Sequence, residues 1–208
     1  MTEKQTFFVT GISTEVGKTI ASAVITEALG ADYWKPVQAG DLDNSDTHKV
    51  QHLISNTKTF FHPNAHALTV PASPHLSAEI DGIQISAKEI NRPKTNNHLV
   101  IEGAGGLLVP LNQNETIADL ILPSDKVIIV SRHYLGSINH TLLTYEALKN
   151  RKLSVFGIIF SGNENKPTED LILSKTQLPM LLRIDEEPYF DATVVRYYTD
   201  KFLENVMF

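Results

Sequence analysis

The chain has 208 residues, of which 42 % are hydrophobic and 20 % charged, and its formal net charge is −6. This composition excludes global disorder and predicts one folded domain over residues 1–208. The acidic balance argues against a nucleic-acid partner, and the absence of cysteine excludes disulfides, thiolate catalysis and cysteine-bound metal clusters. No secretory signal or membrane-spanning apolar run is visible, so we expect a cytoplasmic protein without a membrane partner.

The first elements predicted along the chain are a strand, a helix and a second strand. Thr6–Thr10 is a β-rich run that stops at Gly11. Lys18–Leu29 carries small and apolar residues at helical spacing, and the glycine that follows it is typical of a helix C-cap. A second strand is predicted over Tyr33–Val37, with Pro36 indicating an edge or an end of that strand.

The middle of the sequence has weaker signals. A helix is expected from about Asp46, whereas residues 56–74 are dominated by histidine and proline and predict no element. Ser73 followed by Pro74 is typical of a helix start, and that helix is expected to run through Glu79.

The second half predicts buried strands around a helix. Leu99–Ile101 with Glu102 is a buried-type strand that ends before a run of small residues. Lys126–Ser131 and Ser154–Phe160 are continuous apolar runs, as in parallel strands covered on both faces, and Ser137–Leu148 lies between them as a helix. The alternation predicts an α/β fold with a doubly wound, mostly parallel sheet.

The stretch Gly11–Thr19 (GISTEVGKT) follows the first strand and opens the first helix. In this context a glycine-rich loop presents backbone N–H groups to phosphate oxygens. Lys18 is expected to neutralise phosphate charge, and the Thr19 hydroxyl to take one position on Mg²⁺. Five residues, instead of the usual four, separate the two glycines, so a chance Gly-Lys-Thr is the alternative.

Three further side chains are candidates for the same site. Glu102 ends an apolar strand before four small residues, so it is expected in the ligand crevice as a metal ligand; the alternative is a solvated acid. Asp46 fits either a helix N-cap or a metal ligand, and Lys35 fits either a surface lysine or a site residue. The eight histidines show no metal-ligand spacing and are interpreted as surface or capping groups.

Six motifs taken together resemble those of the dethiobiotin synthetase family, P-loop enzymes that act before the last step of biotin synthesis. The resemblance runs from about Phe8 to Ser161. Its motifs are VTGISTEVGKT (9–19), WKPVQAG (34–40), NSD (44–46), PASPHLSAE (71–79), IEGAGGLLVPL (101–111) and LGSINHTLLT (135–144).

The resemblance implies an ATP-dependent cyclo-ligase that converts 7,8-diaminononanoate, CO₂ and ATP to dethiobiotin, ADP and phosphate, with Mg²⁺ as cofactor. It implies a homodimer whose substrate site lies at the subunit interface. The implied magnesium ligands are Thr19, Asp46 and Glu102, and the implied catalytic residues are Lys35, Lys18 and Thr14.

The resemblance also implies two sets of binding residues. The nucleotide-binding set is Glu15, Val16, Gly17, Lys18, Thr19, Ile20, Asp46, Glu102, Gly103, Ala104, Gly105 and Ser161. The diamine-binding set is Thr14, Lys35, Ala39, Gly136 and Asn139.

The sequence departs from the family pattern at several of these places. Ala39 stands where a serine or threonine is usual, and Tyr134 where a basic residue is common. Ser161 replaces an asparagine that reads adenine, for which Asn163 is a possible substitute, and Arg183-Ile-Asp185 replaces a Gly-x-Ile-Pro stretch. These departures bear on recognition of the nucleobase more than on the reaction.

Two other functions compete with a cyclo-ligase. A nucleotide switch or partner-stimulated ATPase shares the phosphate loop, but the partition-type enzymes carry a lysine after the first glycine, where this chain has Ile12. An amidating ligase for corrin-like acids needs a glutamine-hydrolysing domain with a nucleophilic cysteine, and this chain has no cysteine.

Overall fold

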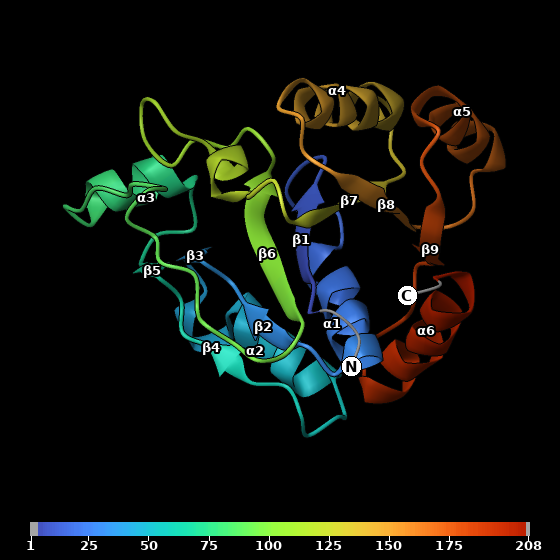
Figure 1. Cartoon of the computed structure of the whole chain (residues 1–208), viewed down its shortest axis with the longest axis horizontal. Coiled ribbons are helices and arrows are strands. Elements are labelled where there is room, and N and C mark those ends of the chain that lie inside the picture. The colour runs from blue at the N-terminus through green and yellow to red at the C-terminus, as the bar shows by residue number, and fades with distance from the viewer. Residues whose placement is uncertain (1–3, 207–208) are drawn as a thin grey trace.

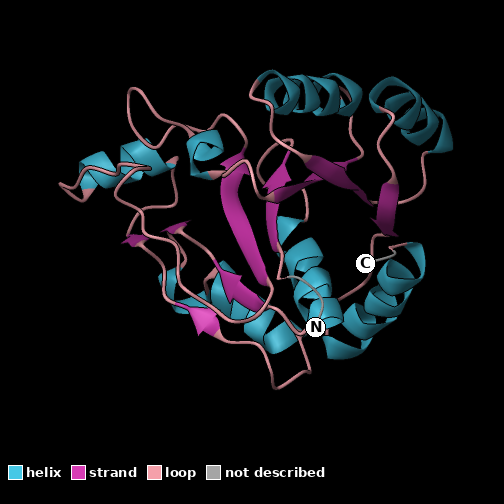
Figure 2. Cartoon of the chain, in the orientation of Figure 1, coloured by secondary structure: helices cyan, strands magenta, loops and turns pink. Residues whose placement is uncertain are grey.

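A computed structural model describes residues 4–206 and builds them around a seven-stranded parallel sheet (Figures 1 and 2). The strand order is β4-β2-β6-β1-β7-β8-β9, which confirms the predicted doubly wound α/β fold. The strands of this sheet are β1 (Thr6–Gly11), β2 (Asp32–Trp34), β4 (Phe61–His62), β6 (Leu99–Gly106), β7 (Lys126–Arg132), β8 (Val155–Ser161) and β9 (Met180–Ile184).

Helices cover both faces of the sheet (Figure 1). On one face α1 (Lys18–Leu29) contacts α2 (Asp46–Leu53) and α6 (Ala192–Asn205), and on the other α4 (Ser137–Asn150) packs beside α5 (Lys166–Thr176). The short α3 (Pro74–Ile80) lies outside these layers, and 3₁₀ turns occur at Leu42–Asn44 and Ile117–Leu120. No helix among residues 4–206 is both long and apolar enough to cross a bilayer.

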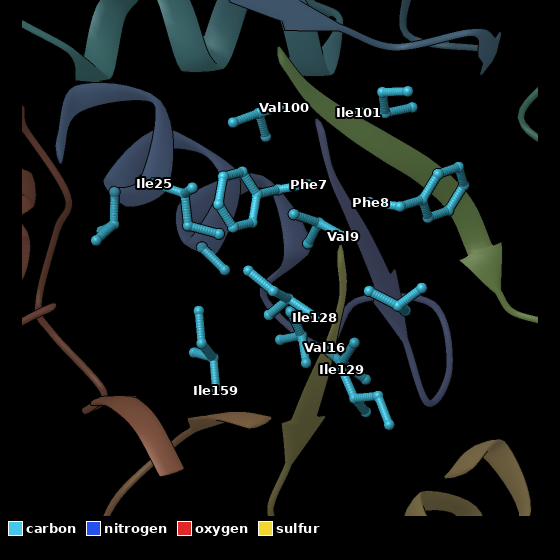
Figure 3. Close-up of a cluster of buried hydrophobic side chains, with 14 of the residues drawn as sticks. Phe7, Phe8, Val9, Val16, Ile25, Val100, Ile101, Ile128, Ile129 and Ile159 are labelled. Carbon is cyan, nitrogen blue, oxygen red and sulfur yellow. The ribbon is translucent and has the colours of Figure 1, made fainter. Parts of the chain in front are cut away.

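The core forms because β1 buries side chains on both of its faces. Phe7 and Phe8 are fully buried, and they point to opposite sides of the strand because successive side chains alternate (Figure 3). Phe7 lies with Ile25 of α1, whereas Phe8 lies beside Ile101 of β6. This packing fixes the carboxyl end of β1, and with it the start of the phosphate loop.

The prediction of one strand over Tyr33–Val37 is wrong, because the chain passes from one sheet to another within this range. β2 ends at Trp34, and β3 (Val37–Ala39) pairs with β5 (His66–Leu68) in a separate two-stranded sheet. Proline has no N–H to donate to a ladder, and the Pro36 carbonyl instead accepts from the N–H groups of residues 65 and 66. β4 and β5 lie in the stretch for which the sequence predicted no element.

Other expectations hold within a few residues. The first helix spans Lys18–Leu29 and ends at a left-handed Gly30, as predicted. The strand expected to end near Glu102 instead continues to Gly106, because Gly106 still pairs with Gly11 of β1. Since all seven strands are parallel, their carboxyl ends meet at one edge, where the candidate residues gather.

Candidate active site

The phosphate loop, residues Gly11–Thr19, joins β1 directly to α1. Gly17 precedes the helix with φ 92°, a left-handed conformation that favours glycine, and a Cβ atom there would lie 2.8 Å from the Ser161 Oγ. Glu15 is also left-handed, with φ 57°. The loop is therefore closely wrapped, and residues 14–20, which include the start of the helix, line one cavity.

Lys18 projects back over this loop. Its side chain is largely buried, and its Nζ donates to the Ser13 carbonyl at 3.1 Å. Burial, together with the nearby ammonium of Lys35, lowers the pKa of Lys18 to about 8, against a partial opposing effect of Glu102 and Asp46. An anion bound in the loop would stabilise the charged form of Lys18.

A pH dependence of nucleotide binding follows. A bound phosphate raises the pKa of Lys18, so ADP binding near pH 8.5 should take up a proton, and ADP affinity should fall as the pH rises past about 8. Calorimetry with ADP and a metal chelator, in two buffers of different ionisation heat, measures this uptake. At pH 7 only about a tenth of Lys18 is neutral, so the buffer dependence should nearly vanish. Equal heats in both buffers at pH 8.5 would contradict the prediction.

Three oxygen-bearing side chains converge beside the loop. The Thr19 hydroxyl lies 3.2 Å from an Asp46 carboxylate oxygen and 3.0 Å from Glu102 Oε1, although the three residues come from α1, α2 and β6. The interpretation of Asp46 as a helix cap is wrong, because Ser45 caps α2 and accepts from the His48 N–H. Glu102 is buried, which rules out the solvated alternative.

Lys35 lies at the centre of this group and is not a surface lysine. Its Nζ lies 2.6 Å from Asp46 Oδ2 and 3.0 Å from Glu102 Oε1, and it donates to the Gly103 carbonyl at 3.1 Å. Burial alone would lower the pKa of Lys35, but the carboxylates of Glu102 and Asp46 hold it above its usual value. The ammonium therefore stays charged across the neutral range.

Two side chains that the sequence analysis missed contact the acidic residues: one binds a carboxylate and the other a backbone N–H. The Tyr33 hydroxyl is fully buried and donates to Glu102 Oε2 at 2.9 Å. The Gln38 carboxamide accepts from the Asp46 N–H at 3.2 Å and donates to the Gly40 carbonyl. Tyr33 and Gln38 are the middle residues of β2 and β3, on either side of Lys35 in the sequence, and this closeness to Lys35 is the one signal that pointed to them.

A cleft of about 690 Å³ extends from this group along the carboxyl edge of the sheet. Of the predicted site residues, those that line it are Thr14, Glu15, Val16, Gly17, Lys18, Thr19, Ile20, Lys35, Ala39, Asp46, Glu102, Gly105 and Ser161. Gly103 contributes its carbonyl to Lys35 instead. The structure thus gathers nearly all the predicted nucleotide-binding residues around one cavity.

The far end of this cleft is acidic. It is lined by Ile184, Phe190 and the consecutive residues Asp185–Glu187, whereas Ser161 lies next to Gly17 of the phosphate loop. The Asp185 carboxylate accepts from Arg183 Nε at 3.0 Å. Asn163 is absent from the lining, so its expected substitution for the missing asparagine gains no support. Arg132, which sequence reasoning also missed, lines the cleft between this end and the phosphate loop.

A second hollow of about 470 Å³ adjoins the cleft. It shares Thr14, Lys35 and Ala39 with the cleft, and it is closed by residues 71–74 and 104–105 together with Val109. Gly136 and Asn139 line neither cavity: Gly136 precedes α4 with φ 102°, and Asn139 is exposed on that helix. The diamine-binding role expected of Gly136 and Asn139 therefore requires a surface that lies outside both hollows.

The histidines fit their predicted interpretation only in part. His48 completes the capping box of α2. His133, in contrast, is neither a surface nor a capping group: its Nε2 lies 2.9 Å from Glu169 Oε1 and its ring stacks on Phe160. Among residues 4–206 no group of three or more His, Cys, Asp or Glu side chains could hold a metal ion.

Solved structures similar to this one share its fold at low identity. The septum site-determining protein MinD of Pyrococcus horikoshii, complexed with Mg-ADP, is 14 % identical with a TM-score of 0.61, covering 98 % of this chain and 93 % of that one. A plasmid partition protein of Borrelia burgdorferi bound to AMPPNP is also 14 % identical, with a TM-score of 0.60 over 97 % of both chains. These similarities establish the fold alone.

Sequence relatives are far closer. A family model described as an AAA domain matches residues 5–194. The ATP-dependent dethiobiotin synthetase of Christiangramia forsetii is 60 % identical over 198 residues, covering 95 % of this chain and 96 % of the relative. That of Cytophaga hutchinsonii is 47 % identical over 201 residues, covering 96 % and 97 %. The chain belongs to the family of ATP-dependent dethiobiotin synthetases.

Proposed function

We propose that this protein closes the cyclic urea of dethiobiotin from 7,8-diaminononanoate and CO₂ at the expense of ATP. The observation that carries the proposal is the junction of two cavities at Thr14 and Lys35. The cleft suits a nucleoside triphosphate with its phosphates in the loop, and the adjoining hollow suits a small second substrate. The two substrates would meet beside Lys35.

The chemistry proceeds in three steps that need no covalent bond to the enzyme. One amine of the substrate adds to CO₂ and loses a proton, which gives a carbamate. A carbamate oxygen attacks the γ-phosphorus, the bond to ADP breaks, and a carbamic–phosphoric anhydride results. The neighbouring amine then attacks the carbonyl carbon, phosphate leaves, and the ring closes with loss of a proton.

Lys18 and Lys35 are suited to electrostatic stabilisation, not to proton abstraction. Each step gathers negative charge on oxygen, and fixed cations in a largely buried site stabilise such charge strongly. Lys35 stays protonated because Asp46 and Glu102 hold it, and Lys18 is mostly protonated below pH 8. We therefore assign Lys18 to the phosphates and Lys35 to the carbamate, with the Thr14 hydroxyl beside both substrates.

Thr19, Asp46 and Glu102 fit a magnesium ion. Mg²⁺ prefers hard oxygen ligands and usually combines one or two carboxylates with phosphate oxygens and water. At the end of the loop the Thr19 hydroxyl lies 3.2 Å from an Asp46 carboxylate oxygen and 3.0 Å from Glu102 Oε1. Bound there, the ion would neutralise charge on the phosphates.

We also propose that the protein forms a homodimer through an apolar face next to Thr14. Leu108 and Leu143 are exposed there and line a hollow of about 420 Å³, together with Thr14 and further residues of α4. A twofold interface uses the same patch on both subunits. Gly136 and Asn139 lie on the adjoining end of α4, where a partner would enclose them. Sedimentation should give twice the mass of the 23.1 kDa chain.

The function is tested with purified protein, ATP, Mg²⁺, bicarbonate and 7,8-diaminononanoate. Dethiobiotin, ADP and phosphate should appear in equal amounts. An 8-aminononanoate without the second amine is the control, because it cannot close a ring. A folded protein that forms no dethiobiotin at millimolar diamine would overturn the proposal, and ATP turnover stimulated by a protein or by DNA instead would favour a partner-dependent ATPase.

A further inference from the structure

Arg132 occupies a central place in the nucleotide cleft without a role in the reaction outlined above. It is the last residue of β7 and pairs in register with Ser161, the last residue of β8. Its Nη1 donates to the Glu15 carbonyl at 3.2 Å, and its Nη2 lies 3.2 Å from Glu186 Oε1. The guanidinium therefore bridges the phosphate loop and the acidic end of the cleft.

The contact with Glu15 acts on the backbone of the loop. Glu15 is not glycine, yet its φ is 57°, so its left-handed conformation is unfavourable unless the surroundings hold it. The peptide unit between Glu15 and Val16 is planar and trans, so its C=O and N–H point in opposite directions. A donor that holds the Glu15 carbonyl also fixes the direction of the Val16 N–H.

We propose that Arg132 is a positioning residue for the nucleotide phosphates, which it serves by fixing the Glu15–Val16 peptide in the orientation that the phosphate loop needs. The inference rests on the proposed nucleotide site. The amides of such a loop bind phosphate only when they converge on it, and an amide that must first reorient binds less tightly.

The contact with Glu186 is a weaker candidate for the role. The Arg132 and Glu186 side chains are 45 % and 59 % exposed, and solvent-exposed ion pairs contribute little. The Glu15 carbonyl, in contrast, belongs to a strained turn, and any change in the conformation of this turn would also move the loop amides. Arg132 therefore acts chiefly through Glu15, and Glu186 serves as a matched control.

The test compares ADP affinity, measured by calorimetry, in the wild-type protein and in Arg132→Met, Arg132→Lys and Glu186→Gln. Arg132→Met should weaken ADP binding about tenfold, the usual order for a lost charge-assisted hydrogen bond. Arg132→Lys should restore most of the affinity, because an ammonium can still donate to the Glu15 carbonyl. Glu186→Gln should lower ADP affinity clearly less than Arg132→Met, because an exposed ion pair contributes little.

A spectroscopic measurement separates positioning from direct contact with phosphate. On ADP binding, the Val16 amide resonance of the wild type should shift as that N–H binds a phosphate oxygen, and Arg132→Met should reduce this shift. An unchanged shift in Arg132→Met, or equal losses of affinity in Arg132→Met and Glu186→Gln, would overturn the inference. A wild-type protein that binds no ADP would instead overturn the proposed function.

Discussion

Replacing Lys35 by methionine should both destabilise the protein and remove most of its turnover. Methionine keeps the volume of the side chain but leaves the carboxylates of Asp46 and Glu102 without the ammonium that lies 2.6 and 3.0 Å from them. Breaking a buried ion pair from one side costs about 3–5 kcal/mol of unfolding free energy. Turnover should fall by about 10²–10³, as when one preorganised donor is lost, with little change in ATP affinity.

The destabilisation should depend on pH in a definite direction. Burial raises the pKa of Asp46, but Lys35, with smaller contributions from Lys49 and the Thr19 hydroxyl, holds it below its usual value in the wild type. Without Lys35 the effect of burial dominates, and the pKa of Asp46 rises above its unfolded value. The variant is then penalised at neutral pH, and the penalty is relieved as the pH falls toward 4, where the buried carboxylate takes up a proton.

Urea unfolding in the absence of metal, at pH 7 and at pH 4.5, measures both effects. Lys49→Met is the matched control, because Lys49 lines the same cleft but pairs with Asp41 at an exposed position. That change should cost less than about 1 kcal/mol at either pH. A Lys35 variant as stable as the Lys49 variant at pH 7 would show that the charges of Asp46 and Glu102 do not need the Lys35 ammonium for their stabilisation.

Local patterns were enough to predict the phosphate loop and the elements next to it. The strand before Gly11, the helix over Lys18–Leu29 and the glycine after it all depend on residues that are neighbours in sequence. The backbone N–H groups of the loop and the start of the helix are both determined by these neighbours, so the loop could be identified without its tertiary contacts.

The group of charges around Lys35 could not be derived in the same way. Lys35, Asp46 and Glu102 are separated by long stretches of sequence, and each has an ordinary alternative taken alone. They meet because Trp34 pairs with Ile101 in the sheet, so the residues that follow these two lie at one level. Strand register depends on the whole sheet, and here the family resemblance supplied what periodicity could not.

The split after Trp34 and the end of the chain were missed for different reasons. Pro36 was read as a strand end, but nothing local indicates that the chain then joins a second sheet. β9 and α6 have mixed composition, and their apolar residues become a core only against β8 and α1. Arg132 was missed because the group that it contacts, the Glu15 carbonyl, lies 117 positions away in the sequence.

Replacing Lys18 by methionine should have the opposite effect on stability and a broader effect on function. Lys18 is buried with a pKa lowered from 10.5 to about 8, so its charged form is disfavoured in the empty protein. That difference in pKa corresponds to roughly 3 kcal/mol at pH 7. The variant should therefore unfold at an equal or higher urea concentration than the wild type, most clearly below pH 8, with the gain fading as the pH approaches 10.5.

Both ATP affinity and turnover should fall in Lys18→Met, because the cation that the phosphates would meet is gone. A lost charge-assisted contact weakens binding about tenfold or more, and loss of the same charge from the transition state lowers turnover further, by about 10²–10³. Calorimetry with ADP and the dethiobiotin assay separate the two effects. The two lysines are thus distinguished by opposite signs in stability and by nucleotide affinity, which only Lys18 should control. Equal losses of ADP affinity in the Lys18 and Lys35 variants would contradict the placement of Lys35 at the carbamate. A Lys18 variant that is less stable than the wild type would contradict the stability prediction, because it would show that the loop stabilises the Lys18 ammonium.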